Sequence, residues 1–177
     1  MKKVEHGKTF DRNAANPPAF EIFHNTVTEG YPEHWHTAIE IIMPTRGEYE
    51  VVVGKDSYNL KEGDIIMINS GVVHGMRFVS QGERIVMLVE PGCVENQEEM
   101  ETIFLRLPAI YFKKEDEEDP FYLFLRSQIL ELVREYDKEG AGMAHRNCTR
   151  LKKLFSEFCR KGFSDANAQN TFGAMKQ

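Results

Sequence analysis

The stretch that decides the fold is HWHTAIE, residues 34–40. His34, His36 and Glu40 all have even numbers, and the sequence IEIIM that overlaps them predicts a β-strand. Because residues two apart on a strand share a face, we expect these three side chains to point the same way, towards an interior.

A fourth residue, His74, follows in the turn sequence NSGVVHGM. Imidazole nitrogens and a carboxylate oxygen are ligands for first-row divalent metals. Three histidines and one glutamate either leave open positions on a six-coordinate ion or complete a tetrahedral zinc site. The alternative is that the side chains hydrogen-bond to each other and to a ligand in a polar pocket.

Short β-rich segments separated by glycine turns run from Phe20 to Pro91. The segments are FEIFHNTV, HTAIEIIMPT, EYEVVVG, DSYNL, DIIMINS, MRFVS and RIVMLVEP. Short strands at close, even spacing with turns between them are typical of an antiparallel sandwich or barrel. We therefore predict a mainly β domain over residues 20–91.

Two helical patterns follow within residues 92–161. In the first, which begins after Pro120, apolar residues recur every four positions. The second runs over about residues 144–161 and has its own apolar face. The polar residues 1–19 predict an extended arm, and residues 162–177 predict a linker or tail.

Composition limits the function classes. A net charge of −6 and a pI near 5.6 argue against a nucleic-acid-binding surface, because phosphate contacts need clustered lysine and arginine. The N-terminus lacks the apolar stretch of a signal peptide, and no apolar run approaches the length that crosses a membrane. We expect a cytoplasmic protein without membrane contact.

The spacing of the two segments resembles the paired motifs of the cupin superfamily. The pattern is H-x-H-x-x-x-E, six residues and Gly47, followed by Gly63-Asp64 and then by Ser70-Gly71-x-x-His74. The resemblance implies a cupin barrel (a double-stranded β-helix, or jelly roll) followed by a C-terminal pair of α-helices. It also implies that the positions matching the family's metal ligands bind one divalent transition metal, Zn, Fe, Ni or Mn; these positions are His34, His36, Glu40 and His74.

The order of arm, barrel and two helices is similar to the N-terminal sensor domain of AraC-type transcription regulators. This resemblance implies a ligand-sensing and dimerisation domain that binds a small-molecule effector inside the barrel. The DNA-binding domain of the full-length family is absent from this chain. The helix faces would then form a homodimer contact through Phe121, Leu125, Ile129, Val133, Leu151, Leu154 and Phe158. Methionine and aromatic side chains adapt to small apolar ligands, and the candidates to line the pocket are Tyr31, Met43, Tyr49, Met67, Met76 and Phe78.

The alternative function is a stand-alone metal-dependent cupin enzyme of the dioxygenase or isomerase type. The sequence offers no dedicated acid or base beyond the four metal-ligand candidates, and it contains no nucleophilic triad motif. We therefore name no catalytic residue and expect a non-enzymatic sensor. A third possibility is a cupin with only a structural or storage role.

Overall fold

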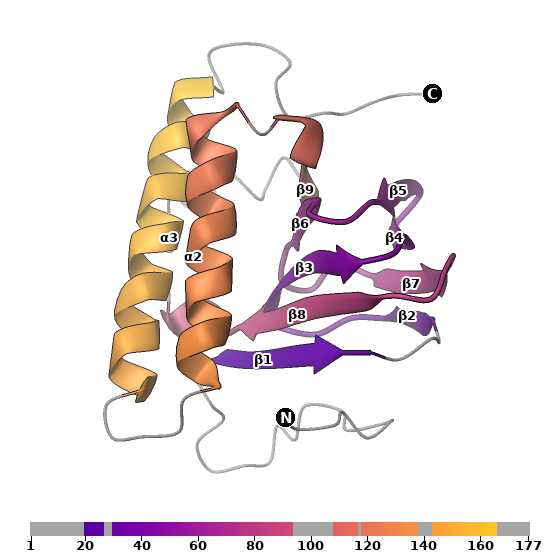
Figure 1. The fold of residues 1–177 in the computed structure, drawn as a ribbon, viewed down its shortest axis with the longest axis horizontal. Coiled ribbons are helices and arrows are strands. Elements are labelled where there is room, and N and C mark those ends of the chain that lie inside the picture. Colours follow the sequence, from indigo (N-terminus) through magenta and orange to yellow (C-terminus); the bar gives the residue numbers. More distant parts are fainter. Residues whose placement is uncertain (1–19, 27–29, 94–107, 117, 138–142, 166–177) are drawn as a thin grey trace.

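Two antiparallel β-sheets face each other, and two helices cover the outer side of one of them (Figure 1). The structure is a computed structural model, and it describes residues 20–26, 30–93, 108–116, 118–137 and 143–165. The predicted arm and the end of the predicted tail lie outside these described residues.

The strand bounds agree with the predicted segments for seven of the nine described strands. They are β1 Phe20–Asn25, β2 Tyr31–His34, β3 Ile39–Arg46, β4 Tyr49–Val53, β5 Asp56–Leu60, β6 Ile65–Ile68, β7 His74–Phe78, β8 Glu83–Val89 and β9 Ala109–Phe112. The five-stranded sheet has the order β1-β8-β3-β6-β9, and the four-stranded sheet has the order β2-β7-β4-β5. Two facing sheets followed by two helices confirm the predicted fold class.

Two of the strands are not predicted by the sequence pattern. Strand β2 has three exposed residues of four, so it shows no apolar alternation. Strand β9 falls within residues 92–161, where only helices are expected, yet it pairs with β6 along the edge of the five-stranded sheet. Strand β6 is equally short but stands out as a run of four buried apolar residues, whereas long-range pairing with β7 and β6 decides the structure of β2 and β9.

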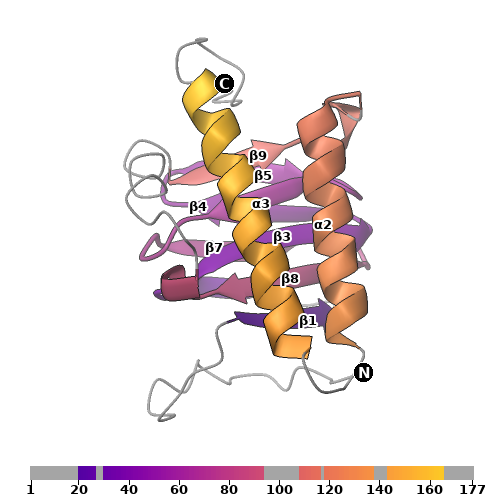
Figure 2. The same cartoon turned by 90° about the vertical axis from the view of Figure 1, so that its left-hand side faces the viewer.

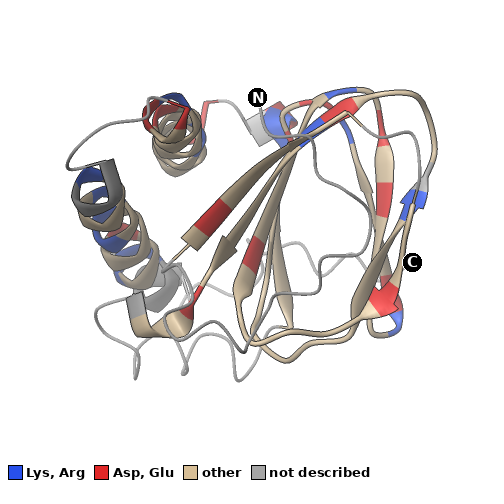
Figure 3. Ribbon diagram, turned by 90° about the horizontal axis from the view of Figure 1, so that it is seen from below, with Lys and Arg blue, Asp and Glu red and all other residues tan. Residues whose placement is uncertain are grey.

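The five-stranded sheet has two buried faces. On β3, β6 and β8 the odd-numbered residues, such as Ile41, Met67 and Met87, form one core with the helices, and on β1 and β9 even-numbered residues such as Phe20 and Ile110 join it. The even-numbered residues of β3 and β6, such as Ile42 and Ile66, form a second core with the four-stranded sheet inside the barrel. Figure 3, seen from below, places the helices outside the barrel.

The two helices run side by side across the five-stranded sheet (Figure 2). Helix α2 is Pro120–Tyr136 and helix α3 is Met143–Asp165; the 3-10 turns η1 and η2 are Pro91–Cys93 and Lys114–Asp116. Asp119 caps α2, because its carboxylate accepts a hydrogen bond from the backbone N of Phe121 at 2.8 Å. The same carboxylate pairs with Lys161 of α3 at 2.8 Å. Among the described residues, no helix is long and apolar enough to span a lipid bilayer.

The apolar helix faces pack inside this chain. The predicted dimerisation residues Phe121, Leu125, Ile129, Leu151, Leu154 and Phe158 are all buried in the core between helices and sheet, and Val133 packs against that core. They are therefore occupied within one chain, and a contact with a second copy has to use another surface. The outer side of α2 exposes two leucines, Leu123 and Leu130.

Candidate metal centre

The four predicted ligands come from both sheets. His34 ends β2 and His74 begins β7, and the two residues lie directly opposite each other on these neighbouring strands of the four-stranded sheet. Glu40 lies in β3 of the five-stranded sheet, and His36 lies in the connection that crosses between the sheets. The expectation that His34, His36 and Glu40 share one strand is therefore wrong, because the chain leaves one sheet and enters the other between them.

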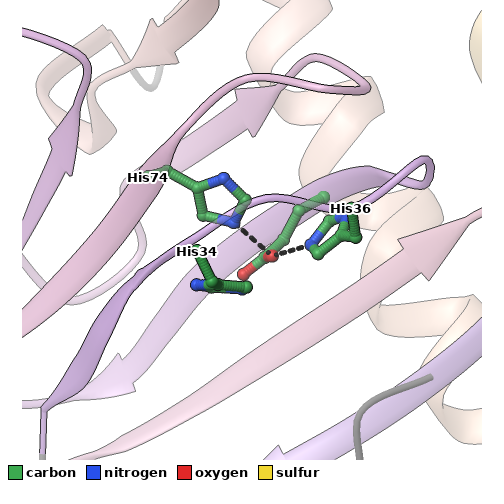
Figure 4. A group of neighbouring side chains, drawn as sticks. His34, His36 and His74 are labelled. Atoms are coloured by element: carbon green, nitrogen blue, oxygen red, sulfur yellow. Dashed lines mark hydrogen bonds and ion pairs between the residues drawn. The ribbon is translucent and has the colours of Figure 1, made fainter.

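The side chains nevertheless converge on one point (Figure 4). The Nε2 atoms of His36 and His74 lie 2.9 and 3.0 Å from the same carboxylate oxygen, Oε2 of Glu40. One ligand atom from each of the four residues lies within 4.8 Å of the others. With bonds of about 2.1 Å, two ligand nitrogens are about 3.4 Å apart on a tetrahedral ion and at most about 4.2 Å apart on an octahedral one, so small movements would give this group metal-binding geometry.

Backbone carbonyls fix the orientation of all three imidazole rings. The Nδ1 atoms of His34, His36 and His74 lie 3.0, 3.0 and 2.8 Å from the carbonyl oxygens of Pro32, Ala38 and Val72. A carbonyl oxygen only accepts, so each Nδ1 donates its proton there and leaves Nε2 for a metal. Metal-binding histidines are commonly held in this way by a second hydrogen bond.

The centre is electrostatically coupled. Burial raises the pKa of the Glu40 carboxyl, but hydrogen bonds from His36 and His74 outweigh it and lower the pKa to about 2. Burial lowers the pKa of His74, yet its hydrogen bond with Glu40 and the charge of Glu40 raise the pKa above its ordinary value. A metal ion would therefore compete with a proton at Nε2 of His74.

His34 differs from the other two histidines. Burial and the neighbouring His74 lower the pKa of His34, so its neutral, metal-binding form dominates at neutral pH. The side chain of His34 is half-buried, whereas that of His74 is buried. His34 therefore lies on the solvent side of the centre.

A glycine turn ties the two halves of the centre together. Gly71 has a φ of +74°, a backbone conformation that residues with a side chain rarely adopt. Its backbone N donates to the carbonyl oxygen of His36 at 2.8 Å. This bond connects the turn before His74 with the crossing segment that carries His36.

The predicted pocket-lining residues divide into three groups. Tyr49 and Met76 lie inside the barrel, and Tyr31 lies at its rim with its ring centroid 4.6 Å from that of His34. Met43 and Met67 are on the opposite face of the sheet, in the core with the helices, so their assignment to the pocket is wrong. The side chain of Phe78 lies outside the described residues.

Sequence reasoning missed one charged residue in the interior. Arg84 on β8 is only 3% exposed, and it lies opposite Pro44 of β3. The signal was available, since an arginine at an inward position of the alternating segment RIVMLVE breaks an otherwise apolar face.

Comparison with known proteins identifies the domain. Residues 25–90 match the family model described as "Cupin domain". None of the curated proteins matches the chain. Residues 25–90 are therefore similar to a cupin domain, in agreement with the motifs.

Similarity to solved structures is found at low sequence identity. A point mutant of ToxT from Vibrio cholerae in its apo form is 10% identical with a TM-score of 0.54, over 83% of this chain and 58% of that one. A point mutant of Bacillus subtilis oxalate decarboxylase is 17% identical with a TM-score of 0.38, over 41% and 22%. The conserved protein SPY1581 of unknown function from Streptococcus pyogenes is 18% identical with a TM-score of 0.37, over 41% and 63%. The chain thus spans less than two thirds of each of these proteins.

Proposed function

We propose that this cupin chain is the ligand-sensing domain of an AraC-type transcription regulator, and that it binds one divalent transition metal. The metal would be held by His34, His36, Glu40 and His74. The observation that carries the proposal is the convergence of three oriented Nε2 atoms on a buried carboxylate. The similarity to the AraC-family regulator ToxT supports the sensor assignment, because it extends over 83% of the chain.

A small-molecule effector would bind beside the metal inside the barrel. Four protein ligands leave two positions on a six-coordinate ion, and an effector oxygen or nitrogen can take them. Tyr31 and His34 are on the solvent side of the centre, while Tyr49 and Met76 line the interior behind it. The effector is therefore expected to join a polar, metal-binding end to a less polar body.

The position of the centre suggests how binding is transmitted. His34 and His74 belong to the four-stranded sheet, whereas Glu40 belongs to the five-stranded sheet that carries the helices. An effector that prefers one relative position of the two sheets would shift the population towards it. The coupling free energy equals the difference in effector affinity between the two arrangements.

Dimerisation is assigned to the outer side of α2. Leu123 and Leu130 are exposed and lie seven residues apart, which places them on one side of the helix. We expect sedimentation analysis of the chain to show a dimer that the double variant Leu123→Lys/Leu130→Lys converts to a monomer. A wild-type chain that stays monomeric at high concentration contradicts this part of the proposal.

Elemental analysis of the purified protein tests the metal centre. We expect close to one transition metal per chain in the wild type and none in His34→Ala/His74→Ala. The exposed His24 on β1 provides the control, because His24→Ala should keep the metal. A folded wild type that neither contains metal nor takes up added Co(II) or Mn(II) refutes the centre.

A metal-dependent enzyme is the second candidate. It is favoured by the solvent-side position of His34, which gives small molecules access to a bound metal. The test is oxygen uptake by Fe(II)-loaded protein with candidate substrates, compared with His36→Ala. Turnover that requires His36 would support the enzyme, and binding without turnover would support the sensor.

A further inference from the structure

Arg84 is an arginine side chain inside the barrel that no part of the metal centre uses. It lies opposite Pro44, and four positions further along β8 Leu88 lies opposite Glu40. Directly opposite residues of antiparallel strands share a face of the sheet. Arg84 and Glu40 therefore face the same interior, about 13 Å apart along the strands between their Cα atoms.

Two of the three guanidinium nitrogens of Arg84 lack hydrogen-bond acceptors among the described residues. Its Nε and Nη1 atoms are fully enclosed and have no hydrogen-bond partner. Its Cζ lies 4.8 Å from the ring centroid of Tyr49, whose own hydroxyl is likewise buried and without a partner. Contact with an aromatic face offsets part of the cost of burying the charge, but it satisfies none of the N–H donors.

No carboxylate of the described residues neutralises this charge at contact distance. Oε2 of Glu40 already accepts from His36 and His74. Glu83, the next residue on β8, pairs with Arg46 on the outside at 3.1 Å. An arginine stays charged in proteins, and a buried charge without a partner is strongly destabilising, so an anion beside Arg84 would be stabilising.

We propose that Arg84 is the anion-binding residue of the barrel and that the effector carries a carboxylate, which Arg84 and the Tyr49 hydroxyl bind while its other end reaches the metal centre. The inference rests on the proposed function, since it names the chemical class of the effector. A singly charged carboxylate balances the guanidinium, whereas a doubly charged phosphate would add an unbalanced negative charge in the interior that contains Glu40. The planar guanidinium also matches the geometry of a carboxylate.

Thermal denaturation and calorimetry of metal-free protein test this inference. The probes are acetate, butyrate and succinate, their uncharged amides, and inorganic phosphate and sulfate. We expect a carboxylate to bind and to raise the melting temperature of the wild type, and the amides and the inorganic anions to have no effect. In Arg84→Met the carboxylate should bind at least about thirtyfold more weakly.

In the absence of ligand, Arg84→Met should be more stable than the wild type, because an apolar side chain replaces an unpaired buried charge. Arg46→Met is the matched control on the outside of the barrel and should respond to carboxylates as the wild type does. Arg84→Lys keeps the charge without the planar donors, and it should fold and bind more weakly if Arg84→Met does not fold.

Three results overturn the inference. They are a wild type that ignores all carboxylates, a wild type that responds only to phosphate or sulfate, and an Arg84→Met variant that still binds carboxylates. A protein that takes up metal but ignores carboxylates refutes the role of Arg84 and leaves the metal centre standing. A protein that binds carboxylates through Arg84 but takes up no metal refutes the metal centre and leaves the role of Arg84 standing.

Discussion

The two faces of the five-stranded sheet are built for different tasks. The face towards the helices is apolar throughout, with residues such as Ile41, Met67 and Met87 packed against α2 and α3. The face towards the barrel interior mixes apolar residues with two buried charged ones, Glu40 and Arg84. Each strand contributes to both faces through alternate residues.

The difference separates stability from function. Burial of apolar surface against the helices supplies free energy of folding, whereas burial of a charge costs free energy unless a partner offsets it. The helix face is therefore expected to respond to substitution with stability changes, and the interior face with binding changes. The following substitutions test this division.

The largest effect is expected on the helix face. Ile129 of α2 is fully buried between helix and sheet. Ile129→Ala should lower the free energy of unfolding by about 2–5 kcal/mol, because it leaves a cavity in a packed core. Urea denaturation measures this change, and metal affinity of the folded protein should stay the same. Arg126→Ala, three residues earlier on the exposed side of α2, should change stability by less than about 0.5 kcal/mol. Equal losses in the free energy of unfolding from both substitutions would contradict the assignment of stability to the buried helix face.

On the interior face, Glu40→Gln should mainly weaken metal binding. The amide keeps the size of the side chain but removes the charge that meets His36 and His74. We expect metal affinity to fall by more than about 100-fold, since replacing even a supporting residue costs 10–100-fold. Competition titration with a metal-binding dye measures this change. Glu50→Gln, at a half-buried glutamate on β4 outside the centre, is the control, and a similar loss there would mean that net charge rather than the centre binds the metal.

The pH dependence of stability gives a smaller effect with a defined sign. The pKa of Glu40 is lowered from 4.5 to about 2, so its contribution is present above pH 4.5 and is lost as the pH falls towards 2. The pKa of His74 is raised from 6.5, so its contribution is complete below pH 6.5 and is lost as the pH rises through the raised value. The melting temperature of metal-free protein should therefore decline above pH 6.5.

Two controls distinguish this decline from general alkaline destabilisation. His74→Ala should lack it, and a saturating divalent metal should suppress it, because the metal replaces the proton on Nε2. A decline of the same size in His74→Ala would show that another group is responsible.

The smallest effect is expected at the start of α2, at the edge of the helix layer. Asp119→Ala removes both the helix cap and the ion pair with Lys161, and it should cost about 1 kcal/mol. Lys161→Met should cost less, because it removes only the ion pair. Urea denaturation of the two variants ranks them, and a larger loss in Lys161→Met would contradict the importance of the cap.

The sequence predicted those helices and strands whose apolar residues recur at regular spacing. Strands of four to eight residues with glycine turns and two amphipathic helices were recognised from alternation and spacing. The four-residue strands β2 and β9 were not, because they depend on pairing with β7 and β6. The helix stripes predicted buried faces correctly, but a stripe does not say whether a sheet or a second subunit covers it.

The sequence named the residues of the candidate site correctly, but it did not predict how the strands place them. The spacing of the histidines and Glu40 named the four residues, while the argument from a single strand failed at the crossing between sheets. Met43 was assigned to the pocket by its chemistry, although its odd position on the strand of Glu40 excludes it from the interior. Tyr49 points into the barrel, whereas Met67 points towards the helices. The direction of each depends on the turn before its strand, which alternation alone does not resolve.

The crossing between the sheets has a consequence for the unfolded chain. Glu40 and His74 are 34 residues apart in sequence, so a metal bound by both closes a long loop. Like a disulfide, such a cross-link lowers the conformational entropy of the unfolded state, by about 4 kcal/mol at room temperature for a loop of this length. His34, His36 and Glu40 lie within seven residues and can still hold a metal after unfolding, which reduces this gain. A metal bound by both Glu40 and His74 would therefore act as a reversible cross-link between the two sheets.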